Sequence, residues 1–283
     1  MNVVVAVDGS KYSRWAVEWA QRMPLRHLER MTAVHVVDVD RIATPLVPTS
    51  TQAWHVPYLK KETARLQAHA RTVMRETKRA LAGGSVKAEV VLAHGPIATE
   101  VLAHAKGANT LVVLGSRGLD ALDRVMLGSV STKVVHHAIG PVLIVKEPPR
   151  RIRQILLAVD GSPASDKALR FLIQQMQAAR GSASGVEVAL LYAMPLLRYP
   201  ELKDAGHELV ARAAVRLEAV GYRVEPLFKI GQPADEVLSY AERHKVDLIV
   251  TGARGRGAIA RFLLGSVSTK LVQHSHTSIL IVR

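Results

Sequence analysis

The segment Leu111–Thr132 reads LVVLGSRGLDALDRVMLGSVST, and the segment Leu248–Thr269 reads LIVTGARGRGAIARFLLGSVST. Each begins with an apolar run typical of a buried strand, continues with Gly-x-x-Gly, and nine residues later reaches Gly-Ser-Val-Ser-Thr at the start of an amphipathic segment. A strand that leads through a glycine-rich loop to a helix N-terminus is a phosphate-binding arrangement. The marked residues are Gly115, Gly118, Gly128 and Ser129 in the first copy, and Gly252, Gly255, Gly265 and Ser266 in the second.

The repetition extends over the whole chain. Residues 2–10, NVVVAVDGS, correspond to residues 155–162, ILLAVDGS. The offset is 152 residues there and 137 at the glycine segments, so the first half carries 15 additional residues. Most of them fall in residues 39–57, where Pro45, Pro48 and Pro57 favour an irregular loop. We therefore expect two domains, residues 1–147 and 153–283, joined by a linker at 148–152.

Apolar strands alternate with helices in both halves. Strands rich in Val, Leu and Ile that alternate with helices imply parallel sheets with helices on both faces. Right-handed crossovers make each half an α/β doubly wound sandwich. We expect strands at about 2–8, 33–39, 86–92, 110–114 and 141–146, then 154–159, 186–193, 222–229, 246–251 and 278–283. We expect helices at about 11–23, 58–81, 97–105 and 129–137, then 163–180, 200–220, 233–244 and 266–275.

The composition excludes several classes of protein. The chain of 283 residues has no cysteine, which excludes disulfides, thiolate metal sites and cysteine nucleophiles. No apolar run approaches the roughly 20 residues of a membrane span. The N-terminus MNVVVAVDGS enters a strand at once, without a basic leader. We therefore expect a cytoplasmic protein with no membrane partner.

The net charge of +14 is divided evenly between the halves. Up to Pro149 there are 19 basic and 12 acidic residues, and the remainder has the same numbers, so each half carries +7. The sequence shows no nucleic-acid-binding module, and only 4% of its residues are aromatic. A solvated basic surface that also attracts polyphosphate ligands is favoured. A nucleic-acid partner is the weaker alternative, and it predicts binding that depends steeply on salt.

Candidate ligand-binding residues gather where the sheet changes winding direction. In open α/β sheets, ligands bind beyond the carboxyl ends of the strands at that point. Asp8 or Asp160 ends the first strand of its half, and the glycine loop follows the fourth. The glycines would let the backbone approach a phosphate, and the helix N-terminus would offer N–H groups and serine hydroxyls to it. Since an aspartate suits ribose hydroxyls or base edges, the most economical ligand is a nucleotide.

The VAVDGS openings, the Gly-x2-Gly-x9-Gly-Ser segments and the order of elements resemble the universal stress protein family in its tandem two-domain form. The resemblance covers essentially the whole chain. It implies two five-stranded parallel sheets of order 3-2-1-4-5, adenine nucleotide alpha hydrolase-like in fold, and binding of ATP, with or without Mg²⁺. The implied cofactor-binding residues are Ala6, Val7, Asp8, Val36, Gly115, Arg117, Gly118, Gly128, Ser129, Val130 and Ser131, and Ala158, Val159, Asp160, Ala193, Gly252, Arg254, Gly255, Gly265, Ser266, Val267 and Ser268.

The resemblance also implies pairing through the fifth strands. Residues 142–146 and 278–282 would pair within one chain as a pseudo-dimer, or the protein would form a homodimer. By the same resemblance, Asp8 and Val36 would hold adenine and ribose. Two departures from the family are Thr277-Ser278, where the first half has Gly140-Pro141, and the strongly basic charge.

Other functional patterns fit less well. No Walker A loop is present, and the Gly255-x-Gly257-x-x-Ala260 match to a dinucleotide fingerprint follows the fourth strand of its half, not the first. The histidines at 136, 137, 274 and 276 lie at helix ends, where histidine commonly caps carbonyls, so no metal site is expected. Arg117 and Arg254 would either clamp phosphates or face solvent.

The sequence thus predicts an ATP-binding regulatory or stress-response protein with two nucleotide sites, no catalytic residues and no dedicated turnover. The alternative is a slow ATPase or a self-phosphorylating protein, in which serines 129, 131, 266 and 268 would accept phosphate. Helix caps and phosphate donors are the favoured roles for these serines.

Overall fold

The computed structural model describes residues 1–38, 52–84, 86–118, 127–178, 185–195, 203–255 and 264–283. The first half contains β1 (Asn2–Ala6), α1 (Lys11–Arg22), β2 (Arg30–Val37), α3 (Gln52–Leu81), β3 (Ala88–His94), α4 (Ile97–His104), β4 (Thr110–Gly115), α5 (Ser129–His137) and β5 (Val142–Val145). The second half contains β6 (Gln154–Ala158), α6 (Pro163–Gln175), β7 (Glu187–Met194), α7 (Lys203–Glu218), β8 (Arg223–Ile230), α8 (Pro233–His244), β9 (Leu248–Gly252), α9 (Ser266–His274) and β10 (Ile279–Val282).

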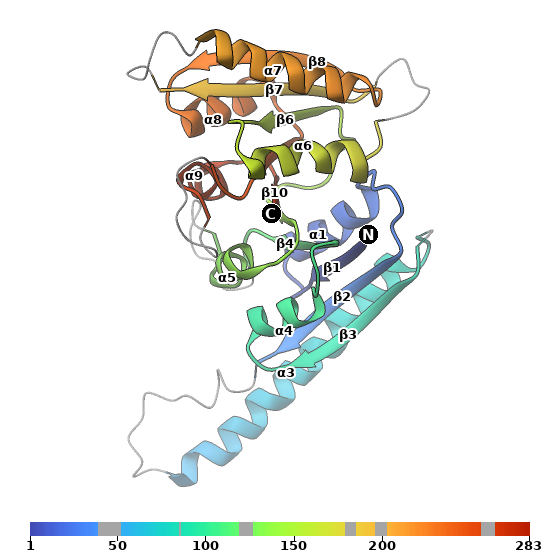
Figure 1. Cartoon of the computed structure of the whole chain (residues 1–283). Helices are drawn as coiled ribbons and strands as arrows, with labels where there is room; N and C mark the ends of the chain where they lie inside the picture. The colour runs from blue at the N-terminus through green and yellow to red at the C-terminus, as the bar shows by residue number, and fades with distance from the viewer. Residues whose placement is uncertain (39–51, 85, 119–126, 179–184, 196–202, 256–263) are drawn as a thin grey trace.

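All of these strands belong to one sheet of ten, in the order β3-β2-β1-β4-β5-β10-β9-β6-β7-β8. Each half therefore has the order 3-2-1-4-5, which confirms the expected topology. Neighbouring strands within a half are parallel, and β5 pairs with β10 in the antiparallel sense, with Leu143 opposite Leu280. The expected pairing of the fifth strands within one chain is thus present, and the two halves lie on either side of it (Figure 1).

Two apolar cores cover the two faces of the sheet, and each core contains residues from both halves. One is formed by the strands with α1, α3, α6 and α7, and the other by the strands with α4, α5, α8 and α9. The central strands are buried along their whole length, as in β4 and β5. This is why they read as continuous apolar runs and not as alternating patterns.

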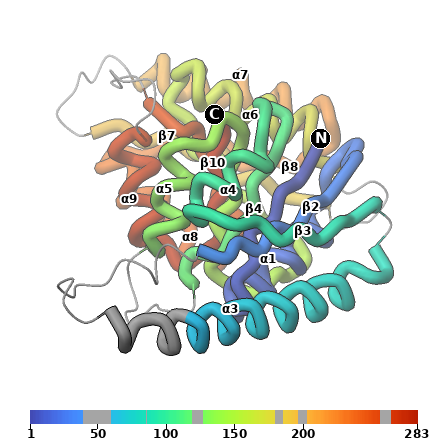
Figure 2. The backbone as a smooth tube through the Cα atoms, turned by 90° about the horizontal axis from the view of Figure 1, so that it is seen from below, coloured from blue at the N-terminus to red at the C-terminus, as the bar shows by residue number. Residues whose placement is uncertain are grey.

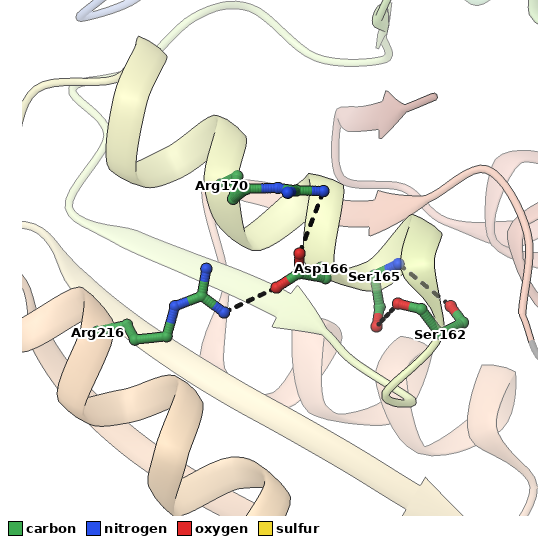
Figure 3. Close-up of polar contacts among 5 residues, drawn as sticks. All are labelled: Ser162, Ser165, Asp166, Arg170 and Arg216. Carbon is green, nitrogen blue, oxygen red and sulfur yellow. Dashed lines mark hydrogen bonds and ion pairs between the residues drawn. The ribbon is translucent and has the colours of Figure 1, made fainter.

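Serine caps begin the first helix of each half. The Ser10 hydroxyl accepts from the Ser13 amide at 3.1 Å, and Ser162 accepts from the Ser165 amide at 3.2 Å. One turn into α6, Asp166 forms ion pairs with Arg170 and with Arg216 of α7 (Figure 3). These contacts attach α7 to α6 on the outer surface of the second half.

Half-buried cations link the halves across the β5–β10 pair. Lys146 Nζ donates to the carbonyl oxygens of Val272 and Ser275, both at 2.6 Å, at the end of α9. In the reciprocal position, the Arg283 guanidinium donates to the Val135 carbonyl near the end of α5. Burial lowers the pKa of Lys146 to about 8, and the nearby charge of Arg117 acts in the same direction.

The clearest departure from the predicted elements is α3. It begins at Gln52, so Pro57 lies inside the helix and the prediction of an irregular loop is wrong for residues 52–57. Pro57 is the sixth helical residue, past the four whose N–H groups have no acceptor in the helix, so it removes one backbone hydrogen bond from α3. The other backbone bonds and the packing of a 30-residue helix offset that loss. Pro45 and Pro48 lie outside the described residues. Among the described helices, none is both long and apolar enough to cross a membrane.

Candidate functional site

The candidate site begins at the aspartate that follows the first strand of each half. One carboxylate oxygen of Asp8 accepts from the Ser10 amide at 2.9 Å, and Asp160 accepts from the Ser162 amide at the same distance. The glycine between them adopts a positive φ, which is +85° at Gly9. This turn fixes the aspartate through Oδ1, and its second oxygen, Oδ2, takes no part in that hydrogen bond.

That second oxygen faces the glycine loop that follows the fourth strand. A Cβ atom placed on Gly118 would lie 2.8 Å from Asp8 Oδ2, and one on Gly255 would lie 2.6 Å from Asp160 Oδ2. Both distances are shorter than a carbon–oxygen contact allows, so a residue with a Cβ at either position would displace the carboxylate. The structure therefore brings together the aspartate and the second glycine of the motif, in the same way in both halves.

The helix that follows the loop starts beside it. Gly128 is the N-cap of α5 and donates its amide to the Ser116 carbonyl at 2.8 Å, and Gly265 donates to the Ala253 carbonyl at 2.8 Å. A glycine cap has no side chain to accept from the first turn. The backbone N–H groups of residues 129–131 and 266–268 have no acceptor within their helices, and they carry the positive end of the helix dipole. This is the part of each site that suits an anion.

Two of the predicted hydroxyl donors are engaged elsewhere. The hydroxyl of Ser131 donates to the Gly115 carbonyl at 2.8 Å, and that of Ser268 donates to the Gly252 carbonyl at 2.8 Å. Both side chains are buried. They fix the helix start to the end of the strand, and a phosphate contact of these two serines stays a prediction. Ser129 and Ser266 are exposed at the first helical position.

The first glycine of each motif is explained by packing. A Cβ on Gly115 would lie 2.6 Å from the Cβ of Tyr12, and one on Gly252 would lie 2.5 Å from the backbone carbon of Ala164. Both glycines are buried under the first turn of the first helix of their half, which is α1 or α6. They let α1 and α6 approach the sheet. The approach of the backbone to a phosphate at these glycines stays a prediction.

Apolar residues form the floor beneath the aspartates. Val36 and Ala193 are buried near the ends of their strands, in the core that contains α4 and α8, and Ala6 and Ala158 pack against the same core. Val7 and Val159 belong to the core on the other face. The edge that would receive a base or ribose is therefore apolar below and acidic at Asp8 or Asp160.

The two loop arginines lie at the edge of the sites. Arg117 is half-buried, and its guanidinium carbon lies 5.9 Å from the centre of the Tyr12 ring. Arg254 is also half-buried, and its carbonyl accepts from the Ser162 hydroxyl at 3.3 Å. Arg117 thus lies over the first turn of α1, next to the loop that carries Gly118.

Sequence reasoning missed two histidines in the first half. His35 is buried in β2, and its Nδ1 donates to the Val7 carbonyl at 2.8 Å. His69 on α3 donates through Nε2 to the Asp8 carbonyl at 2.9 Å. Burial lowers the pKa of His35, while the bond to Val7 opposes that effect. The available signal was a single ionisable residue inside the apolar strand sequence TAVHVV.

Within the described residues, no group of three or more His, Cys, Asp and Glu side chains could hold a metal ion. His136 and His137 lie in the last turn of α5, and His274 in the last turn of α9. Burial lowers the pKa of His136, and the charges of His137 and Arg283 add to that effect. The chemistry of the site therefore depends on a carboxylate, backbone N–H groups and an apolar floor.

Related proteins share this organisation over the full length of the chain. A universal stress protein of Mycolicibacterium smegmatis is 29% identical over 304 aligned positions, covering 100% of this chain and 97% of the relative. A universal stress protein of Mycobacterium tuberculosis is 30% identical over 321 positions, covering 100% of this chain and 95% of the relative.

A solved structure has the same fold. The crystal structure of a universal stress protein from Archaeoglobus fulgidus matches with a TM-score of 0.67 at 19% identity, covering 100% of this chain and 98% of that one. The model of the Universal stress protein family matches residues 1–146 and again residues 151–283. With a match to each half and relatives along its entire length, the chain belongs to the universal stress protein family.

Proposed function

We propose that the chain binds one adenine nucleotide in each half, with ATP as the physiological ligand, and acts as a regulatory stress-response protein. The observation that carries the proposal is the contact between Oδ2 of Asp8 and Gly118, repeated at Asp160 and Gly255. The carboxylate would accept hydrogen bonds from ribose hydroxyls or a base edge. The first turns of α5 and α9 would bind the phosphates through backbone N–H groups.

The position of these groups supports a nucleotide over a simple anion. An anion needs only the helix N-terminus, whereas a carboxylate nearby would repel it. A ligand with phosphates at one end and hydroxyl groups at the other uses both features. The apolar floor that includes Val36 or Ala193 suits a base.

Magnesium would accompany ATP mainly through the nucleotide. Mg²⁺ bound with nucleotides usually keeps several waters and takes phosphate oxygens with one or two carboxylates. The described residues contain no cluster of three or more metal ligands. Among the residues that the structure describes, Asp8 and Asp160 are the carboxylates that lie within the proposed sites.

Calorimetric titration of the full chain with ATP tests the proposal. We expect two nucleotides per chain in the native protein and one in either Gly118→Ala or Gly255→Ala. The added Cβ displaces the carboxylate, and loss of one charge-assisted hydrogen bond, about 1.5–3 kcal/mol, weakens that site about 10- to 100-fold. Gly185→Ala is the matched control, because a Cβ there meets no atom within 4 Å.

Absence of nucleotide binding in the native chain, or two intact sites in both variants, would refute the proposed site. Measurement of phosphate release and of protein labelling distinguishes a regulatory protein from a slow ATPase or a self-phosphorylating one. We expect less than about one turnover per minute, far below typical enzyme rates.

A further inference from the structure

The helix α3 carries a strongly basic surface that the nucleotide sites do not involve. Between residues 60 and 81 it has seven basic and two acidic residues. All seven basic side chains are exposed, and we call them the α3 basic stripe: Lys60, Lys61, Arg65, Arg71, Arg75, Lys78 and Arg79. One of them, Arg65, forms an ion pair with Glu62 at 3.8 Å.

The stripe occupies the face of the helix opposite the core. At about 100° per residue, the seven residues fall within an arc of about 140°. The buried residues Ala70, Val73, Thr77 and Leu81 fall within about 80° on the other side. The basic residues are therefore gathered on one side and face away from the body of the protein.

The helix also extends beyond the sheet that it covers. No residue from 60 to 69 is buried, and Figure 1 shows the first part of α3 projecting past the strands. Figure 2 shows the helix along the outside of the first half, next to α1. From Lys60 to Arg79 the stripe is about 28 Å long, which is the length of about eight base pairs of a duplex.

The corresponding helix of the second half has no such stripe. In α7 (Lys203–Glu218) there are three basic and three acidic residues. Arg212 pairs with Glu208 at 3.4 Å, and Arg216 pairs with Asp166 at 2.7 Å, as Figure 3 shows for the second pair. Since both halves have the same fold, the fold does not require the excess charge of α3.

From this arrangement we infer that the α3 basic stripe binds the phosphate backbone of a nucleic-acid duplex without sequence preference. A duplex presents a continuous row of charges, one per about 1.7 Å of axis, and a straight cationic helix is complementary to it. The stripe supplies no aromatic side chain for stacking on single-stranded bases.

Other polyanionic partners fit the described part of α3 less well. A helix that binds a membrane surface inserts an apolar face beside its charges. From Ala70 onward the apolar face of α3 is packed against the protein core. An acidic protein partner would require buried anchors such as Tyr or Trp at the centre of the contact, and the stripe has none.

The test is fluorescence anisotropy of a labelled, mixed-sequence DNA duplex with the full-length chain between 50 and 200 mM KCl. We expect the logarithm of the binding constant to fall linearly with the logarithm of salt concentration. In Lys61→Gln/Arg71→Gln/Arg75→Gln we expect a slope smaller by about two to three and binding at least about tenfold weaker at 50 mM KCl. Glutamine keeps the helix propensity, and these side chains are exposed, so the fold is retained.

The charge-matched control is Lys203→Gln/Arg212→Gln/Arg243→Gln, which removes three exposed cations from the second half. We expect its affinity to stay within about twofold of the native value. The inference would be overturned if the duplex did not bind, or if both triple variants lost the same affinity for it. Binding to single strands that is tighter than to the duplex, or binding to anionic phosphatidylserine vesicles that equals it, would also overturn the inference. ATP titration of the same variants tests the proposed function separately. If that function holds, both variants bind two nucleotides per chain, whether or not the duplex binds.

Discussion

The glycines of the repeated motif have different physical roles. Gly118 and Gly255 leave space beside a carboxylate, whereas Gly115 and Gly252 leave space beneath a helix. None of the four has a positive φ, so they are required for volume and not for backbone freedom. Spacing in the sequence indicates that a side chain is excluded at these positions, but it does not show which atoms exclude it.

This difference predicts that alanine at Gly115 or Gly252 lowers the stability of the fold, whereas alanine at Gly118 or Gly255 weakens nucleotide binding. In Gly115→Ala the new Cβ would lie 2.9 Å from a backbone carbon of Tyr12, so α1 must move. We expect a loss of about 1–3 kcal/mol in the free energy of unfolding, measured by denaturant titration, and a similar loss for Gly252→Ala. Gly185→Ala serves as the control and should be neutral, since its Cβ meets no atom. Unchanged stability in the first two variants would contradict the packing role.

The histidines near Asp8 show what a single sequence could not predict. His35 and His69 donate to carbonyl groups 28 and 61 residues away. Backbone carbonyls carry no sequence signal, because every residue has one. The aspartates, in contrast, were predictable as candidates, since each ends an apolar strand in the same DGS sequence.

At the scale of elements, apolar periodicity and caps predicted nearly every helix and strand. The helices Ser129–His137 and Pro233–His244 agree with prediction at both ends. Two helices differ more. The helix α3 begins six residues before the predicted residue 58, because a local rule excludes proline from a helix, and α6 ends at Gln175, five residues before the predicted residue 180. Local sequence rules weigh one residue, whereas a long helix is stabilised by many backbone bonds and by packing.

Lys146, which follows β5, is expected to make the free energy of unfolding depend on pH. The pKa of Lys146 is lowered from 10.5 to about 8 by burial. Between these values Lys146 is neutral in the folded protein and protonated in the unfolded chain. The unfolded chain then binds more protons, so the free energy of unfolding rises with pH over this interval, by at most about 3 kcal/mol.

Denaturant unfolding of the native chain and of Lys146→Met at pH 7.5, 9 and 10 measures this contribution. We expect the difference between the two proteins to change in favour of the native chain as the pH increases. The methionine variant is the control for the remaining titrating groups, which both proteins share. A difference that stays constant across this range would show that the ammonium group titrates normally.

At the scale of the whole molecule, the internal repeat predicted two similar halves and the resemblance predicted how they pair. The pairing itself depends on contacts between residues far apart in the chain, such as Leu143 and Leu280. Periodicity within one segment does not identify a partner strand. A further contact between the halves was not predicted: Leu25 bridges Met176, and Arg26 Nε donates to the Met176 carbonyl.

The fragment 1–147 tests how strongly β5 tends to pair with another strand when β10 is removed. All four residues of β5 are buried in the complete chain. Without β10 the fragment exposes an apolar strand with unpaired backbone groups, which favours pairing with another copy. We expect sedimentation velocity at micromolar concentrations to show self-association of the fragment that the full chain lacks under the same conditions. A fragment that stays monomeric would indicate that β5 contributes little to the pairing.

The pairing of β5 with β10 takes place inside one polypeptide, and this has a consequence for the cell. Two separate chains obey mass action, so their paired fraction falls on dilution, whereas a covalent link fixes the local concentration of the partner. Every copy of this protein is therefore a complete pair, however few are made. The two halves can also diverge independently in sequence. The molecule is therefore asymmetric in charge: α3 in the first half is basic, whereas α7 in the second half has equal numbers of basic and acidic residues.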